Sequence, residues 1–236
     1  MHKQLLKKIN SHKASVGLIG LGYVGLPLAV ELAKKNFTVT GFEIDAKKTN
    51  NIKNGHSYIG DIKSEEIEKL VRAKKLFATT NFSGLTDMDV IIICVPTPLS
   101  KSKDPDVSYI VSAAEKIRQT LKKGQLIILE STTYPGTTKE ILLPKLESSG
   151  LKCCVDFFLA FSPERIDPAN KKFTIANTTK VVGGLCKKAS VLASALYGSF
   201  TKVHKVSSPE AAEMVKLLEN TFRSVNIGFI NEVALM

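Results

Sequence analysis

Short apolar segments alternate with segments of helical periodicity along most of the chain. Two of them, Asp89–Val95 and Gln125–Glu130, are nearly all apolar, which is typical of strands buried on both faces of a parallel sheet. Further strands are predicted at Val16–Ile19, Phe37–Phe42, Lys75–Thr79, Val155–Ala160, Thr179–Val182 and Thr201–Val206. Helices are predicted at Ala46–Asn54, Glu65–Ala73 after a Ser64 cap, Asp106–Lys122, Thr137–Ser148 and Lys187–Leu196. This alternation predicts right-handed crossovers and a doubly wound, mostly parallel α/β sheet.

The last predicted helix is longer than the others. Ser207 or Ser208 can cap it, Pro209 suits its first turn, and no stop signal follows before Met236. Its apolar residues keep helical spacing: Met214, Val215, Leu218, Phe222, Val225 and Phe229. A helix of about 29 residues would be about 43 Å long. We therefore expect the chain to end inside a helix that continues.

A glycine-rich turn lies between the first strand and the helix that follows it. The turn reads Gly20-Leu-Gly22-Tyr23-Val24-Gly25, the pattern of a dinucleotide-binding βαβ unit. Gly20 permits the tight turn, Gly22 lets the backbone approach a pyrophosphate, and Gly25 lets the helix pack on the strand. The helix N-terminus then favours the anion. A glycine turn in another kind of α/β protein is the alternative.

The acidic residue at the end of the second strand bears on the choice of cofactor. Glu43 follows the glycine turn at about the expected 20-residue offset, where a carboxylate accepts the ribose hydroxyls of NAD and repels the 2′-phosphate of NADP. Lys47 and Lys48 come soon afterwards and can soften that repulsion, or they can be solvated residues of a first helical turn. NAD is therefore the expected cofactor.

These patterns together define the expected organisation. We predict a basic N-terminal lead over 1–14, a Rossmann-like domain over 15–206 and the start of a long central helix over 207–236. No apolar run approaches the ~20 residues that span a bilayer, and Met1–Lys13 lacks the apolar core of a secretory signal. We therefore expect a cytoplasmic protein without membrane attachment.

The net charge and the cysteines give no support for nucleic-acid binding or for a metal site. The net charge of +11 is compatible with nucleic-acid binding, yet the lysines are scattered in pairs without interleaved aromatic residues, which argues against it. The four cysteines, Cys94, Cys153, Cys154 and Cys186, lack the spacing of metal ligands, so no metal site is expected. They are interpreted as small buried residues in a reducing compartment.

Four further segments stand where strand ends or the last helix would meet a ligand. They are Cys94–Pro98, Glu130–Gly136, Phe161–Pro168 and Lys216–Asn220. With the glycine turn, and in the same order and spacing, they resemble the nucleotide-sugar 6-dehydrogenases, the UDP-glucose/GDP-mannose dehydrogenase family. The resemblance covers 15–236. It implies an NAD-dependent four-electron oxidation in which the C6 hydroxyl of a sugar nucleotide becomes a carboxylate.

Two segments bear on the sugar. Gly55–Ile59 and the Arg165-Ile166 pair look most like the family members that act on UDP-N-acetylglucosamine, whereas the UDP-glucose enzymes usually carry a Phe-Leu pair at the second position. UDP-N-acetylglucosamine is therefore the expected substrate. UDP-glucose, UDP-N-acetylmannosamine and GDP-mannose remain alternatives.

The resemblance also implies roles for individual residues. Lys216 and Asn220, four apart on one helical face, would stabilise oxyanions. Glu164 would transfer a proton or place a water, Thr133 would hold that water or the cofactor, and Arg165 would contact the sugar nucleotide. Thr97 and Glu130 would line the NAD site. Each has a purely structural alternative, such as a solvated Lys216, a helix-capping Glu164 or a turn at Thr133.

One expected element of the family's chemistry is missing. Its second oxidation needs a cysteine in a glycine-rich loop followed by Pro-Lys-Asp, and none of the four cysteines has that context, Cys186 being nearest. We therefore expect the nucleophile and a UDP-binding domain to lie beyond Met236. The chain would bind NAD without completing catalysis alone, and it would dimerise through the central helix. A non-catalytic NAD-binding module is the alternative of another class.

Overall fold

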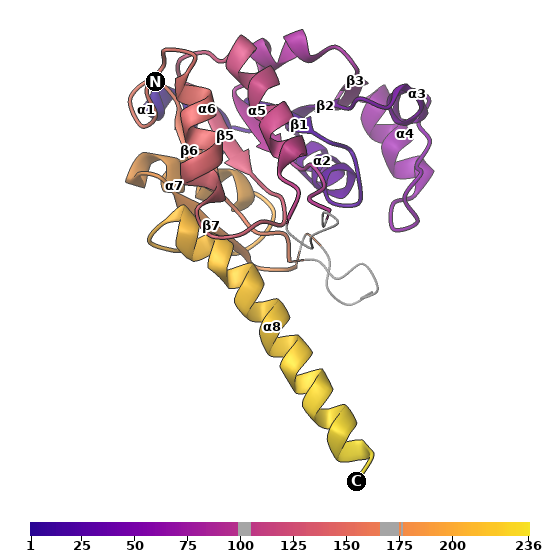
Figure 1. The fold of residues 1–236 in the computed structure, drawn as a ribbon. Helices are drawn as coiled ribbons and strands as arrows, with labels where there is room; N and C mark the ends of the chain where they lie inside the picture. Colours follow the sequence, from indigo (N-terminus) through magenta and orange to yellow (C-terminus); the bar gives the residue numbers. More distant parts are fainter. Residues whose placement is uncertain (99–104, 166–174, 176) are drawn as a thin grey trace.

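The computed structural model describes residues 1–98, 105–165, 175 and 177–236, and the motif residues 166–168 lie outside this part of the chain. Eight strands form one sheet in the order β3-β2-β1-β4-β5-β6-β7-β8 (Figure 1). The strands are β1 Ser15–Ile19, β2 Thr38–Phe42, β3 Leu76–Thr79, β4 Val90–Ile93, β5 Leu126–Leu129, β6 Phe158–Phe161, β7 Lys180–Gly184 and β8 Val203–Lys205. The predicted doubly wound, mostly parallel sheet is confirmed.

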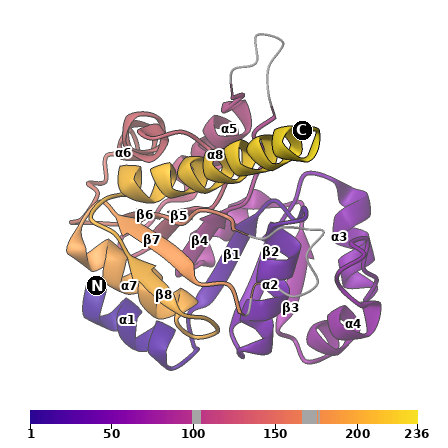
Figure 2. The ribbon, with the colours of Figure 1, turned by 90° about the horizontal axis from the view of Figure 1, so that it is seen from below.

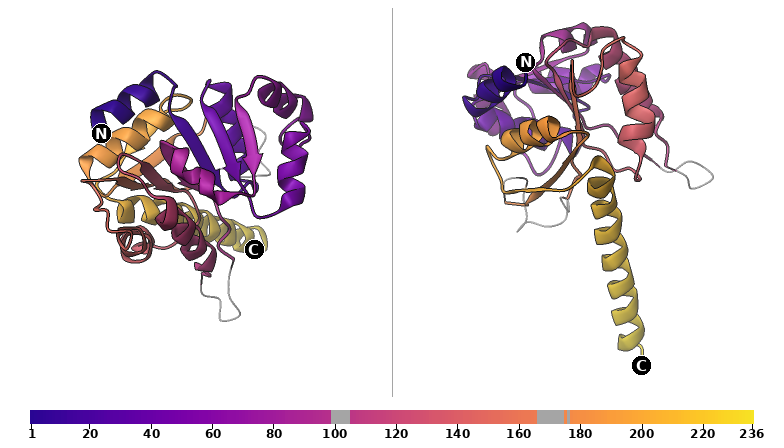
Figure 3. Two further views of the ribbon diagram at one scale, coloured as in Figure 1. Left: turned by 90° about the horizontal axis from the view of Figure 1, so that it is seen from above. Right: turned by 90° about the vertical axis from the view of Figure 1, so that its left-hand side faces the viewer.

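Helices cover both faces of the sheet. Figure 2 shows α1, α2 and α7 on one face and α5 and α6 on the other, and Figure 3 shows the same layers from two more sides. The helices are α1 His2–Asn10, α2 Gly25–Lys34, α3 Ala46–Lys53, α4 Ser64–Arg72, the 3₁₀ helix η1 Phe82–Asp87, α5 Ser108–Thr120, the π-helical η2 Thr137–Leu142, α6 Leu143–Glu147, α7 Lys187–Tyr197 and α8 Pro209–Ala234.

Burial on both faces explains why the central strands are apolar throughout. Val90 and Ile92 of β4 point into the core beneath α2 and α7, while Ile91 and Ile93 point into the core beneath α5 and α6. Successive side chains of a strand alternate between faces, so a strand covered on both sides has no solvated position. The apolar run therefore identified the middle of the sheet.

Two features of strand order position the functional site. β1 pairs in parallel with both β2 and β4, so the winding of the chain reverses beside its carboxyl end, where open α/β sheets bind ligands. β7 instead runs antiparallel to β6, with Phe161 opposite Gly183. Because β7 is reversed, its first residue, Lys180, lies at the edge where the parallel strands end.

A buried carboxylate fixes α8 to the domain. Ser208 caps the helix through its side chain, as predicted. Glu213, fully buried, accepts hydrogen bonds from the backbone N–H groups of Gly136 (2.7 Å) and Thr138 (2.9 Å) and from the Thr138 hydroxyl (2.6 Å). Beyond this anchor the helix leaves the domain, and its apolar side chains from Phe222 onward are exposed (Figure 1).

Several expected elements differ from those observed. The basic N-terminal lead contains α1, whose Leu5 and Ile9 are buried in the core beside α7. The spacing of four between Leu5 and Ile9 is typical of a helix, but the surrounding lysines make this short amphipathic pattern hard to see in the sequence. The helix expected after a Ser64 cap begins at Ser64 itself, because the Ser64 hydroxyl instead accepts from the Ser57 backbone N–H (3.0 Å). α8 has 26 residues and ends at Ala234, slightly short of the expected length.

The strand expected over Val155–Ala160 begins later, at Phe158. Residues 154–156 turn, with Cys154 in the left-handed region at φ 67° and the Asp156 carboxylate accepting from the Lys152 N–H (3.0 Å). The apolar character of Val155 suggested a strand, but its side chain is 66% exposed in this turn.

The helices of the described residues bear on membrane attachment. No helix among them combines the length and apolar character needed to cross a bilayer. The cytoplasmic location expected from the sequence stays a prediction.

Replacing Glu213 with Gln should lower the free energy of unfolding by about 2 kcal/mol. The Gln side chain has an NH2 group in place of one carboxylate oxygen, so one backbone N–H group that donates to Glu213 in the wild type would lose its acceptor. Urea denaturation measures the change. Glu210→Gln is the control on the same helical turn, and its loss should be smaller, because that carboxylate is partly exposed and interacts with Lys139 (3.5 Å), Ser208 and its own backbone N–H group. Equal losses in the two variants would contradict the anchoring role of Glu213.

Candidate functional site

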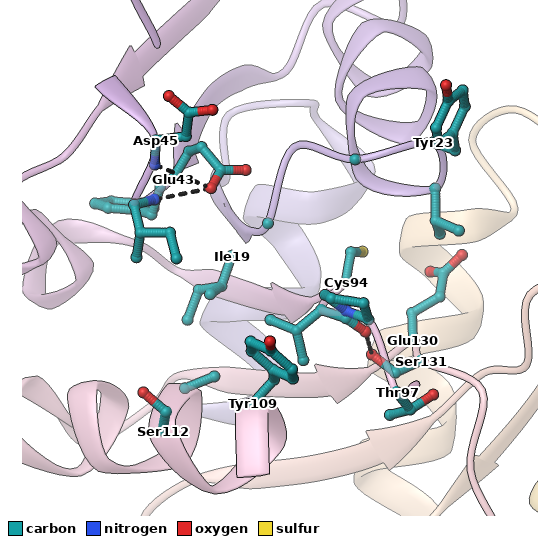
Figure 4. Close-up of a pocket in the computed structure, with 18 of the residues that line it drawn as sticks. Ile19, Tyr23, Glu43, Asp45, Cys94, Thr97, Tyr109, Ser112, Glu130 and Ser131 are labelled. Atoms are coloured by element: carbon teal, nitrogen blue, oxygen red, sulfur yellow. Dashed lines mark hydrogen bonds between the residues drawn. The ribbon is translucent and has the colours of Figure 1, made fainter. Parts of the chain in front are cut away.

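A cavity of about 550 Å³ opens at the carboxyl edge of the parallel strands. Its wall comes from the glycine turn after β1, the segment after β2, the segments after β4 and β5, Glu164 after β6, and one side of α5. Figure 4 shows Glu43 and Asp45 at one end and Thr97, Glu130 and Ser131 at the other, with Tyr109 and Ser112 along the floor. An elongated ligand can therefore contact several of these segments at once.

The three glycines of the turn differ in what surrounds them. Gly20 has φ +92°, and a Cβ there would lie 2.6 Å from the Cys94 carbonyl oxygen. A Cβ on Gly25 would lie 1.9 Å from the Gly20 carbonyl oxygen, so only glycine lets α2 start this close to β1. A Cβ on Gly22 would meet nothing within 4 Å. The protein itself does not need glycine at 22, which is the expectation for a position that a ligand approaches.

Glu43 is held rigidly at the end of β2. Its carboxylate accepts from the backbone N–H groups of Leu21 and Ile44, each at 2.9 Å, and the Lys48 ammonium lies 3.6 Å away. The residue is only 7% exposed, yet it lines the cavity together with Lys48. The Asp45 backbone N–H group also donates to it at 3.3 Å, so three backbone groups fix the carboxylate at the edge of the cavity.

Tyr23 and Thr97 lie at the rim of the cavity. Tyr23 follows Gly22 and is 73% exposed, while Val24 precedes the first residue of α2, whose N-terminus has no side-chain cap. The Thr97 hydroxyl donates to the Thr132 carbonyl oxygen, which ties the segment after β4 to the segment after β5. Most of the predicted cofactor residues line this one cavity, namely Gly20, Gly22, Tyr23, Val24, Glu43, Lys48, Thr97 and Glu130, whereas Gly25 lies behind its wall.

A buried ion cluster lies behind Glu130. The Lys180 ammonium contacts the Glu130 carboxylate and lies 3.5 Å from the Glu164 carboxylate, and the Tyr197 hydroxyl donates to the other oxygen of Glu130. Burial raises the pKa of Glu130 to about 7, against the opposing effect of Lys180. Sequence reasoning missed Lys180 and Tyr197, because one lysine at the start of an apolar strand and one tyrosine in a helix carry no recognisable pattern.

Thr133 lies in the turn after β5 and is buried. Its hydroxyl is hydrogen-bonded to the Thr137 hydroxyl, which also donates to the Tyr134 carbonyl oxygen (2.8 Å). The neighbouring residues Ser131 and Thr132 line the cavity, while Thr133 does not. Thr133 therefore forms part of the turn after β5, the same turn whose backbone N–H groups donate to Glu213.

Glu164 and Lys216 come together from β6 and α8. Glu164 is 6% exposed and lines the cavity, and Lys216 is half-buried one helical turn after Glu213. Burial lowers the pKa of the Lys216 ammonium, and the carboxylates of Glu164 and Glu219 oppose that shift. Asn220 follows on the same face of α8 and is exposed.

Arg165 points to α8 instead of the cavity. Its guanidinium forms a two-point ion pair with Glu219 and donates to the Thr179 carbonyl oxygen at 2.7 Å. Planar guanidinium and carboxylate groups match in this arrangement. The pair joins the end of β6 to the helix that carries Lys216, and Glu219 was not among the predicted site residues.

Two family models match the chain. Residues 14–201 match the NAD binding domain of the UDP-glucose/GDP-mannose dehydrogenase family, and residues 210–236 match its central domain. The chain belongs to the UDP-glucose/GDP-mannose dehydrogenase family. The predicted family and the predicted NAD cofactor are therefore confirmed.

Curated relatives carry more than one substrate name. The chain is 41% identical over 224 residues to a UDP-N-acetyl-D-glucosamine 6-dehydrogenase of Pseudomonas aeruginosa, covering 94% of this chain and 52% of that protein. It is 37% identical to a UDP-N-acetyl-D-mannosamine dehydrogenase of Pyrococcus horikoshii, covering 94% and 53%. The chain spans about half the length of the curated relatives it matches.

Solved structures give the same result. A UDP-D-ManNAc dehydrogenase from Pyrococcus horikoshii superimposes with a TM-score of 0.87 at 38% identity, covering 94% of this chain and 53% of that one. A ternary complex of GDP-mannose dehydrogenase from Pseudomonas aeruginosa superimposes with a TM-score of 0.85 at 28% identity, covering 92% and 51%. Both similarities extend over nearly all of this chain.

The residues present fit an adenine dinucleotide. Gly22 leaves open space beside the N-terminus of α2, where a pyrophosphate is favoured, and Glu43 can accept from ribose hydroxyls. Thr97, Glu130 and Ser131 line the far end of the same cavity. These residues would hold the cofactor, and the carboxylate of Glu43 opposes a 2′-phosphate.

Gly22→Ala and Gly25→Ala form a matched pair of variants. Gly22→Ala should leave the melting temperature unchanged and weaken NAD⁺ binding at least about tenfold, because the added methyl group faces only the ligand. Gly25→Ala should lower the melting temperature, because its methyl group meets the Gly20 carbonyl oxygen. Calorimetric titration and thermal melting separate the two effects. A Gly22→Ala variant with unchanged affinity would argue against pyrophosphate binding at this turn.

Proposed function

We propose that this chain is the cofactor-binding part of an enzyme that oxidises the C6 hydroxyl of a UDP-N-acetylhexosamine to the carboxylate in two hydride transfers. The observation that carries the proposal is the interaction of the Lys216 ammonium on α8 with the carboxylate of Glu164, which lines the cavity. When bound, NAD⁺ accepts the hydride. A buried carboxylate and a half-buried ammonium next to the cofactor are the groups that move a proton and stabilise an oxyanion.

The chain's own residues divide the work in this proposal. Lys216 stabilises the alkoxide and later oxyanions, assisted by Asn220 one turn further along α8. Glu164 transfers a proton or orients a water molecule. Thr133 acts through the turn after β5, where its hydroxyl bonds to Thr137. Arg165 positions α8 through Glu219 and contacts the sugar nucleotide only if that ion pair opens.

The acetamido sugars are favoured over the alternatives. Relatives of similar identity are named for UDP-N-acetyl-D-glucosamine and for UDP-N-acetyl-D-mannosamine. The Gly55–Ile59 segment and Arg165 favour UDP-N-acetylglucosamine. UDP-glucose and GDP-mannose remain the alternative substrates within the family.

We also propose an organisation, which the half-length coverage of the relatives supports. Residues 15–206 form the NAD-binding domain and 207–236 begin the central helix. The nucleophilic cysteine and the UDP-binding domain belong to a part of the enzyme that this chain does not supply. We also propose a homodimer formed through α8, since its apolar side chains from Phe222 to Val233 are exposed.

Calorimetric titration of the chain with NAD⁺, NADP⁺ and UDP-N-acetylglucosamine tests the proposal. NAD⁺ should bind, NADP⁺ should bind at least about tenfold more weakly because Glu43 repels the 2′-phosphate, and the sugar nucleotide should not bind measurably. A folded chain that fails to bind NAD⁺ would remove the cofactor assignment. Tight binding of the sugar nucleotide, or sugar-dependent NADH production by this chain, would show that the substrate site is complete without another domain.

The proposed dimer predicts concentration-dependent self-association. Phe222→Glu and Phe229→Glu should shift the chain toward monomer in sedimentation equilibrium, because each places a charge in an apolar contact. Ser224→Glu is the control, since it adds the same charge at an exposed polar position on the opposite face of the same helix. A wild-type chain that stays monomeric at all concentrations, or three variants that behave alike, would contradict dimerisation through this face.

A further inference from the structure

The segment between α3 and α4 contacts the glycine turn. The Tyr58 hydroxyl donates to the backbone carbonyl oxygen of Leu21 at 2.6 Å. Leu21 is the middle residue of Gly20-Leu21-Gly22 and is fully buried. Its backbone N–H group donates to the Glu43 carboxylate at 2.9 Å. Both backbone polar groups of Leu21 are therefore held by side chains that lie far from it in the sequence.

The segment that carries Tyr58 is itself fixed. The Ser57 backbone N–H group donates to the Ser64 hydroxyl oxygen at 3.0 Å, at the start of α4. The Ser57 hydroxyl donates to the Ile59 carbonyl oxygen at 2.9 Å, and the Ile59 side chain is buried in the core. The Tyr58 side chain packs against the same core. Tyr58 therefore reaches Leu21 from a rigid support.

The planarity of the peptide bond transmits this contact to the next residue. The Leu21 carbonyl group and the Gly22 N–H group belong to one peptide unit, and in a trans peptide they point in opposite directions. Because Tyr58 fixes the direction of the carbonyl group, it also fixes the direction of the N–H group. Gly22 lines the cavity, and among the described residues no group accepts a hydrogen bond from its N–H. This donor is therefore available to a ligand at the glycine turn.

The Tyr58 hydroxyl remains a donor over the pH range of binding measurements. Burial raises the pKa of this hydroxyl, and the nearby carboxylates of Glu43 and Asp45 raise it further. A hydroxyl that donates to a carbonyl oxygen also polarises the peptide unit, because hydrogen bonds in a chain strengthen one another. The bond from Tyr58 therefore makes the Gly22 N–H group a stronger donor as well as an oriented one.

We propose that Tyr58 is a positioning residue for the dinucleotide: through the Leu21–Gly22 peptide it orients the Gly22 N–H group toward the pyrophosphate and strengthens that hydrogen bond. The inference rests on the binding of NAD in this cavity and not on the identity of the sugar. Tyr58 is not among the described residues that line the cavity, so it acts through the backbone. The Gly55–Ile59 segment thereby gains a role at the cofactor.

Tyr58→Phe keeps the ring that packs against the core and removes only the hydroxyl group. It should weaken NAD⁺, NADH and ADP-ribose by about fivefold each, because all three contain the same pyrophosphate and lose the same support. Adenosine contains no pyrophosphate, so its affinity should not change. Calorimetric titration measures the first three dissociation constants, and saturation-transfer NMR measures the fourth.

Glu43→Gln is the contrasting variant. Because Glu43 accepts from the adenosine ribose in the proposed site, this change should weaken adenosine as well as NAD⁺. The melting temperature of Tyr58→Phe should fall by no more than about 3 °C, as expected for one lost hydrogen bond. In the ligand-free Tyr58→Phe chain, the ¹⁵N resonance of the Gly22 amide should move upfield, because the bond that polarised its peptide is gone.

The outcomes separate the inference from the cofactor assignment. If the folded wild-type chain binds neither NAD⁺ nor ADP-ribose, the cofactor site is wrong and the inference falls with it. If Tyr58→Phe binds both as tightly as the wild type, the positioning role is wrong while the site stands. An equal loss for adenosine and ADP-ribose would also overturn the inference, since the change would then affect the whole site. A loss confined to the ligands that contain a pyrophosphate would support it.

Discussion

The contact between Gly25 and the Gly20 carbonyl oxygen is the constraint on which the site depends. The first turn of α2 crosses the end of β1 so closely that a methyl group at position 25 would lie 1.9 Å from that oxygen, far inside van der Waals contact. This approach aims the N-terminus of α2 along the carboxyl edge of the sheet. The segments after β2, β4 and β5 then complete a cavity whose position was decided by one residue without a side chain.

Much of this arrangement could be predicted from the sequence, because its causes are local. An apolar run such as β4 indicates a strand that is buried on both faces. The glycine spacing indicates a tight turn, whose formation depends on neighbouring residues rather than on a distant partner. Glu43 and Thr97, which line the cavity, could be picked out in the same way because each follows a strand end. The amphipathic spacing in α1 was equally local, but its apolar pair was obscured by the surrounding lysines.

The remaining features depend on contacts between residues far apart in the chain. Lys180 is buried because the reversed direction of β7 places it beside the carboxylates of Glu130 and Glu164. No local sequence pattern indicates that a strand will run antiparallel to its neighbour. The roles of Arg165 and Thr133 could not be foreseen for the same reason, since their partners are Glu219 and the turn that Glu213 anchors. The roles that we propose for Lys216 and Asn220 come from family resemblance rather than from local physics.

The attachment of α8 makes the helix a lever with a short arm and a long one. Lys216 lies three residues from the Glu213 anchor, whereas Phe229 lies sixteen residues away, or about 24 Å along the axis. A tilt of roughly ten degrees about the anchor moves Lys216 by less than ~1 Å and Phe229 by about 4 Å. A partner bound to the exposed half of α8 can therefore move widely while the Lys216 ammonium keeps its place near Glu164.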